Sequence, residues 1–149
     1  NHSGHIKLLN IKFHDKKSSK SGIIRCGKDV IFTLTIECTK KLMDISFLLA
    51  FKDHFGNRIT VLNSKTAGFS FEIPKGRHDV SCTVPHFSLS PGNYDAEVKV
   101  LQNSDLLIWV NNQLTIKVES GDFYNSGRLP KTKWGGICHL QQKWEIYEA

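Results

Sequence analysis

Six residues in the middle of the chain have side chains suited to holding a sugar: Lys52, His54, Asn63, Glu97, Lys99 and Trp109. An indole ring offers a flat apolar surface on which the apolar face of a sugar stacks, while charged and amide groups hydrogen-bond its hydroxyls. Trp109 is the leading stacking residue, because Asn111 and Asn112 follow it at the expected end of a strand. The apolar run 106–110 equally favours a tryptophan buried in the core, so both interpretations stay open.

Most of these polar residues lie on segments whose residues alternate between apolar and polar. Such alternation predicts a strand with one face buried and the other exposed. Two outward-facing sets follow from it, namely Leu48, Ala50, Lys52 and His54 in residues 45–54, and Asp95, Glu97 and Lys99 in residues 94–100. If both segments belong to one sheet, the two sets form a polar platform for a glycan. An ordinary solvated sheet face is the alternative.

Arrangements typical of catalysis are missing from the sequence. The seven histidines are scattered, and Asp53 and His54 would point to opposite faces of one strand. Gly27-Lys28-Asp29 lacks the upstream glycine and the following Ser or Thr of a phosphate-binding loop. We therefore predict that the protein is not an enzyme and needs no cofactor. A nucleophile–base pair assembled across two strands is the remaining catalytic alternative.

The four cysteines, Cys26, Cys38, Cys82 and Cys138, include no CxxC pair. Zinc sites need closely spaced ligand pairs, so no metal site is expected. Four cysteines are too sparse for a disulfide scaffold, although two bridges would be possible, and a reducing compartment is favoured. Cys38 shares the parity of the apolar residues in 30–36 and is expected in the core.

The chain is basic, with a formal net charge of +6. This charge favours attraction to an anionic partner such as a phosphate, an acidic sugar or nucleic acid, and solvated loops are the alternative. A nucleic-acid partner is not expected, because no outward strand face combines paired aromatic residues with Arg or Lys.

The elements that would position the candidate residues are short strands. Residues 29–38 alternate strictly, and similar runs recur at a spacing of roughly 8–12 residues, separated by turns such as Ser90-Pro91-Gly92-Asn93. Residues 106–110 and 114–118 are predicted to pair as a hairpin joined through Asn111-Asn112. The pattern predicts an all-β sandwich or barrel of about eight or nine strands.

The whole chain, 1–149, is predicted to be a single domain. Residues 120–136 form a glycine-rich connection to a last short element. That element is predicted to be a strand over 144–147, in which Trp144 is buried, although helical spacing is also present. The longest uncharged apolar stretch, residues 45–51, is far shorter than the roughly 20 residues of a membrane helix.

Four segments, taken in order, resemble a known family. They are Ile45-Ser-Phe-Leu-Leu-Ala-Phe-Lys-Asp53 followed by Gly56, then Phe69-Ser-Phe-Glu-Ile-Pro74, then Ser90-Pro-Gly-Asn-Tyr94, and finally Gly136-Ile-Cys-His-Leu-Gln-Gln-Lys-Trp-Glu-Ile146. Together they resemble the C-terminal polysaccharide-recognition domain of Wzt-type ATPases. These ATPases are the nucleotide-binding subunits of ABC transporters that export bacterial O-antigens. Where relatives often have His before the closing basic-Trp-Glu, this chain has Gln141-Gln142-Lys143, so no site role is transferred there.

The resemblance implies an immunoglobulin-like or jelly-roll antiparallel sandwich that binds the non-reducing terminus of the finished O-antigen polysaccharide. It implies a cytoplasmic location at the inner membrane, with an attached ATPase domain and the membrane permease of the transporter as partners. It also implies that a homodimer can form by exchange of the C-terminal strand.

Taken together, these observations predict a non-catalytic carbohydrate-binding module. The glycan would lie on the outward face that carries Lys52, Glu97 and Lys99, with Trp109 and Asn63 at its edge. The positive charge further predicts an acidic or phosphorylated cap on the glycan. The alternative is an extracytoplasmic adhesion or chaperone-like sandwich that binds a protein by strand addition and contains oxidised cysteines.

Overall fold

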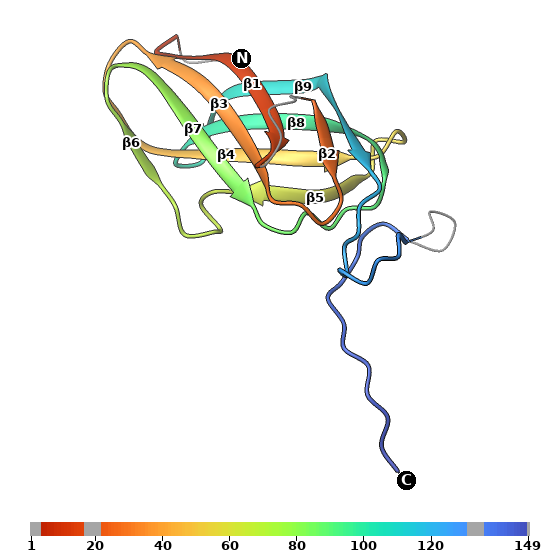
Figure 1. Cartoon of the computed structure of the whole chain (residues 1–149). Helices are drawn as coiled ribbons and strands as arrows, with labels where there is room; N and C mark the ends of the chain where they lie inside the picture. The colour runs from red at the N-terminus through yellow and green to blue at the C-terminus, as the bar shows by residue number, and fades with distance from the viewer. Residues whose placement is uncertain (1–3, 17–21, 131–135, 149) are drawn as a thin grey trace.

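The computed structural model describes residues 4–16, 22–130 and 136–148, with residues 112 and 113 described in backbone only. Nine strands in these ranges form two facing sheets (Figure 1). They are β1 (Ile6–Asp15), β2 (Ile23–Arg25), β3 (Val30–Cys38), β4 (Leu42–Lys52), β5 (Arg58–Asn63), β6 (Phe71–Ile73), β7 (Gly76–Val84), β8 (Gly92–Gln102) and β9 (Asp105–Glu119). The predicted all-β sandwich is confirmed. The described ranges hold no helix that could span a membrane.

The two sheets differ in width. The smaller sheet has the strand order β1-β3-β7, and the larger has the order β2-β9-β8-β4-β5, with β6 paired to β4. All pairings are antiparallel except that of β2 with β9, which is parallel. The sequence pattern missed β2 because three residues are too few to show alternation.

The core fills the space between the sheets with the apolar positions that alternation identified. In β3 these positions are all buried, and they include Cys38 as predicted. The Phe32 ring of the smaller sheet lies 5.6 Å, centroid to centroid, from the Phe51 ring of the larger. Each fully buried side chain of this size contributes about 1.5–3 kcal/mol relative to exposure, so the facing apolar sets hold the sheets together.

The predicted hairpin at Asn111-Asn112 is wrong, because residues 105–119 form one continuous strand. β8 is long enough to pair with both halves of β9. Ala96 of β8 pairs with Leu114 and Glu97 pairs with Asn111, so residues 112 and 113 are extra residues in a bulge. The turn lies earlier, between Gln102 and Asp105, where Asn103 has a φ of 53°.

The C-terminal segment leaves the sandwich. Cys138 forms an isolated antiparallel bridge with Leu89, and the N–H of buried His139 donates to the Ser88 oxygen at 2.7 Å. Residues 140–148 then extend away without strand pairing (Figure 1). Trp144 is 86% exposed, so its predicted burial in a terminal strand is wrong for a single copy of the chain. The physical reason is that no neighbouring strand lies beside the described part of this segment. Of the predicted connection 120–136, residues 131–135 lie outside the described residues.

Gly121 fixes the point where β9 passes into this segment. A Cβ atom at this position would lie 2.0 Å from the backbone oxygen of Cys26, whose own N–H donates to the Glu119 oxygen at 3.0 Å. We expect Gly121→Ala to destabilise the domain by about 2–3 kcal/mol, because the backbone of residue 26 must move. Urea unfolding measures the effect. Ser120→Ala, at an exposed neighbouring position, should change stability little, and an equally stable Gly121→Ala would contradict the expected clash.

Candidate functional site

Strand register brings five of the six candidate residues onto the outward face of the larger sheet. Leu48 of β4 pairs with Asn63 of β5 on one side and with Lys99 of β8 on the other. Lys99 in turn pairs with Trp109 of β9. Directly opposed residues in a sheet point to the same side, so these side chains form one row across four strands.

Two further rows complete the face. Ala50 pairs with Glu97, which pairs with Asn111, and Lys52 lies between Arg58 and Asp95. The two outward sets therefore do share a sheet. Ala50 is fully buried although it faces outward, which indicates that longer side chains on the neighbouring strands cover it.

Glu97 is at the centre of the face and is only 5% exposed. Its Oε1 accepts a hydrogen bond from Arg58 Nη2 at 2.7 Å, and its Oε2 accepts one from Trp109 Nε1 at 2.8 Å. A buried carboxylate is costly unless it is paired and hydrogen-bonded, and here both oxygens are engaged. Desolvation alone would raise the pKa of Glu97. The hydrogen bonds from Trp109 and Arg58, with the charges of Lys99 and Lys52, outweigh it and lower that pKa.

Trp109 is 42% exposed, which decides between its two interpretations in favour of a surface residue. The hydrogen bond to Glu97 fixes one edge of its indole ring. The Lys99 ammonium lies 5.5 Å from the ring centroid, a cation–π distance. The ring is thus held in one orientation while nearly half of its surface meets solvent, as stacking on a sugar requires.

Two members of the face were missed by the sequence reasoning. Arg58 directly follows the turn before β5, and it begins that strand opposite Lys52. Asn111 was assigned to a hairpin turn, but it lies within β9, where its Oδ1 accepts a hydrogen bond from Lys52 Nζ at 2.6 Å. A bulge between Phe51 and Lys52 sets the register that places Arg58. Alternation alone gives no signal for that bulge.

His54 lies outside this group of contacts. β4 ends at Lys52, so the predicted strand 45–54 runs two residues too far. The Asp53 carboxylate accepts the backbone N–H groups of Phe55 and Asn57 at 3.0 and 2.8 Å, which turns the chain at this point. His54 is therefore exposed in the turn, where its ring lies 4.1 Å from that of Phe55.

Asn63 ends β5 and shapes the loop after it. Its Oδ1 accepts the N–H of Lys65 at 3.0 Å, and its backbone oxygen accepts the Thr66 hydroxyl at 3.1 Å. Among the described residues, no three His, Cys, Asp or Glu side chains come close enough together to hold a metal ion. The face combines cations, an amide and a partly exposed indole, which suits it to binding a polar ligand with a flat apolar surface.

Comparisons with known proteins agree with this description of a β-sandwich binding domain. The family model of the Wzt C-terminal domain matches residues 1–140, and the chain belongs to that family. The family comprises non-catalytic, carbohydrate-binding domains of O-antigen ABC transporters. The predicted resemblance is confirmed.

Solved structures show the same fold at low sequence identity. The chain is similar to the structure described as "Crystal structure of the C-terminal domain of wzt", with a TM-score of 0.75 and 12% identity over 98% of this chain and 86% of that one. It is also similar to a Niemann-Pick type C2 protein from Japanese carpenter ant, with a TM-score of 0.53 and 9% identity over 77% and 93% of the two chains. No curated protein matches the sequence.

Replacing Glu97 by Gln should destabilise the domain by about 1–3 kcal/mol at neutral pH, since a neutral amide leaves Arg58 without its counter-charge. The pKa of Glu97 is lower in the folded than in the unfolded state. The Glu97 charge therefore contributes fully to the free energy of unfolding above the unfolded pKa. That contribution is lost as the pH falls through the folded pKa. The difference in the free energy of unfolding between wild type and Glu97→Gln should therefore shrink as the pH is lowered from about 7 to about 3. Urea unfolding at each pH measures it.

Glu72→Gln is the matched control, because Glu72 forms an exposed ion pair with Lys41. Exposed pairs contribute about 0–1 kcal/mol, so this variant should differ little from wild type at either pH. A Glu97→Gln difference that stays constant over the pH range would contradict a role for the Glu97 charge.

Proposed function

We propose that this domain binds the non-reducing terminus of an O-antigen polysaccharide on the outward face of β5, β4, β8 and β9. The observation that carries the proposal is the Trp109 indole, which is partly exposed and held by buried Glu97 on the polar face of a Wzt-family sandwich. Binding of a completed chain without chemical change would couple its completion to export by the transporter.

The Trp109 ring would stack on the terminal sugar, while Lys52, Lys99 and Asn63 would contact its hydroxyls or cap. His54 is exposed in the turn at one end of the face and would meet only a glycan that extends past Lys52. Glu97 would act mainly by positioning Trp109, because both of its oxygens already accept hydrogen bonds.

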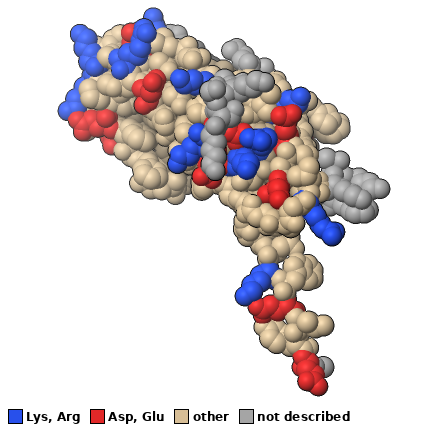
Figure 2. All heavy atoms as spheres, viewed as in Figure 1, with Lys and Arg blue, Asp and Glu red and all other residues tan. Residues whose placement is uncertain are grey.

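An acidic or phosphorylated cap is favoured by the local charges of the face. Lys52, Arg58 and Lys99 provide three cations against two carboxylates, Asp95 and Glu97. The net charge of the whole chain is weaker support, because much of it lies elsewhere. Figure 2 shows Lys and Arg side chains gathered at the end of the sandwich that holds the β3–β4 and β6–β7 turns.

An NMR amide-shift titration with O-polysaccharide of the source strain, capped and uncapped, tests terminus recognition. Shifts at Lys99 and Trp109 with the capped polymer alone would support the proposal. Shifts with both polymers would replace it with binding to internal repeats. No shifts with either polymer would reject the glycan and favour the strand-addition alternative.

Lys52→Ala and Lys99→Ala should each weaken binding of the capped polymer by about tenfold, the loss of one charge-assisted hydrogen bond of roughly 1.4 kcal/mol. Affinity should also fall as salt is added, because the contacts are exposed to solvent. Calorimetric titration measures both effects. Lys75→Ala removes the same charge from an exposed turn and should leave affinity unchanged. Salt-independent binding would reject the acidic cap.

The partners proposed from the family are the attached ATPase domain and the membrane permease, at the cytoplasmic side of the inner membrane. A homodimer formed by exchange of the C-terminal segment is also proposed. The extended segment supports it, because its apolar side chains are exposed: Leu140, Trp144, Ile146 and Tyr147.

Truncation after residue 139 should convert a dimer of the full chain into a monomer, because the exchanged segment is removed. Light scattering coupled to size exclusion measures the mass of each. A full chain that is monomeric, or a truncated chain that stays dimeric, would contradict strand exchange.

A further inference from the structure

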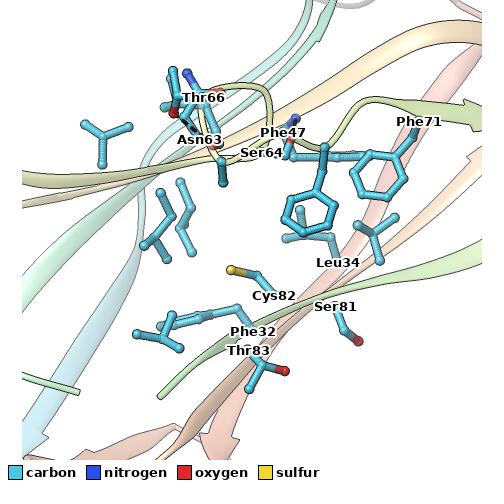
Figure 3. Close-up of a pocket in the computed structure, with 18 of the residues that line it drawn as sticks. Phe32, Leu34, Phe47, Asn63, Ser64, Thr66, Phe71, Ser81, Cys82 and Thr83 are labelled. Atoms are coloured by element: carbon cyan, nitrogen blue, oxygen red, sulfur yellow. Dashed lines mark hydrogen bonds between the residues drawn. The ribbon is translucent and has the colours of Figure 1, made fainter. Parts of the chain in front are cut away.

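A cavity of about 780 Å³ lies between the two sheets, on the side where β5 and β7 are the outermost strands (Figure 3). Ligand pockets in proteins typically measure about 300–1,000 Å³ and are lined mainly by apolar and aromatic side chains. Its lining is made mainly of inward positions of the two sheets, and it also includes Leu48, Val61 and Asn63 of the outward face. Among the side chains lining it are Phe32, Phe47, Leu49, Leu62, Val80 and Cys82.

The cavity exists because the inward face of β7 is incompletely covered. Cys82 pairs with Phe32 and Val80 pairs with Leu34, so these β7 residues point into the sandwich with the core residues of β3. Phe32 and Leu34 are buried, whereas Cys82 is exposed and Val80 only partly covered. Cys82 alternates in step with Val80 and Val84 along β7, and the structure puts it at an opening of the core.

The lining is mainly apolar, and its polar side chains besides Cys82 are those of Asn63, Ser64, Thr66, Ser81 and Thr83. None of the described residues that line it carries a charge. In Figure 3 the Cys82 sulfur points into the space, while the Ser81 and Thr83 hydroxyls point away from it. At the rim, the Ser64 hydroxyl accepts the Phe47 N–H at 2.9 Å, and the Thr66 hydroxyl donates to the Asn63 backbone oxygen at 3.1 Å.

These surroundings select among possible occupants. A peptide strand would bring its own N–H and C=O groups into the cavity, where they would lose water without gaining partners. A sugar would incur the same cost through its hydroxyls. A hydrocarbon chain has no such groups and gains from contact with Phe32, Phe47 and Leu49.

We propose that the cavity between β5 and β7 binds a single uncharged hydrocarbon chain. This proposal does not rest on the glycan site, and Asn63 is the one candidate glycan residue that also lines the cavity. The Cys82 thiol supports it, because desolvation by its apolar surroundings raises the thiol pKa. A bound chain would cover this sulfur and exclude water from the cavity.

The test uses N-phenyl-1-naphthylamine, an uncharged fluorescent probe, displaced from the full chain by linear alcohols. We expect saturable binding, and we expect affinity for the alcohols to rise by about fourfold per methylene from octanol to dodecanol. Dodecyl maltoside below its micelle concentration distinguishes a free chain from one attached to a sugar. Displacement by both compounds would show that the cavity binds the alkyl chain and tolerates an attached sugar. Displacement by dodecanol but not by dodecyl maltoside would show that the cavity takes only free chains.

Two variants on adjacent positions separate this cavity from other apolar surfaces. Cys82→Phe fills the cavity and should weaken probe binding by at least tenfold. Ser81→Phe adds the same ring on the side pointing away from the cavity and should leave binding unchanged. Two results would overturn the proposal. One is the absence of saturable probe binding to the wild type. The other is equal binding by Cys82→Phe and wild type, because the probe would then bind at another apolar surface, such as the exposed C-terminal segment.

A second measurement does not depend on how Cys82→Phe folds. In a Cys138→Ser background, Cys82 is the one exposed thiol of the three remaining cysteines, since Cys26 and Cys38 are buried. Saturating dodecanol should slow alkylation of Cys82 by N-ethylmaleimide at least fivefold. An unchanged alkylation rate would overturn the proposal.

Discussion

The outward face of the larger sheet depends on one buried charge. Glu97 accepts hydrogen bonds from Arg58 on the edge strand and from Trp109 on β9, so a single carboxylate ties three strands together across the small residue Ala50. Without both donors, burial of this carboxylate would be unfavourable. With them, the indole keeps one orientation and the cations on either side keep their spacing. The outward face is therefore held by the hydrogen bonds of a buried carboxylate to Arg58 and Trp109.

Much of this arrangement follows from local sequence, and the rest depends on pairing between distant segments. Alternation identified the core of β3, β4 and β8, and with it the outward positions of Lys52, Glu97 and Lys99. Each of these assignments needs only the two-residue period of a strand. Arg58 and Asn111 could not be placed this way, because a bulge beside each one sets its partner. Bulges are set by the match between two strands, which alternation within one strand does not encode.

The C-terminal segment marks a second limit of local reasoning. Its apolar residues predict burial, yet Trp144 and Ile146 are exposed in a single copy of the chain. Apolar type indicates that a side chain favours burial, but it does not encode which surface covers it. The same limit applies to Cys82. Its parity is that of a core residue, but coverage depends on whether a strand of the facing sheet lies opposite.

The unequal widths of the two sheets link the polar face to the cavity. Three strands cannot cover six, so the β5 side of the larger sheet is left without a complete layer beneath it. Alternate residues of β4 therefore serve different surfaces: Phe47 and Leu49 line the cavity, whereas Lys52 belongs to the polar face. Both the cavity and the polar face require a rigid β4. Because core packing of Phe51 against Phe32 fixes the end of β4 nearest Lys52, the packing that closes the sandwich there also orients the polar face.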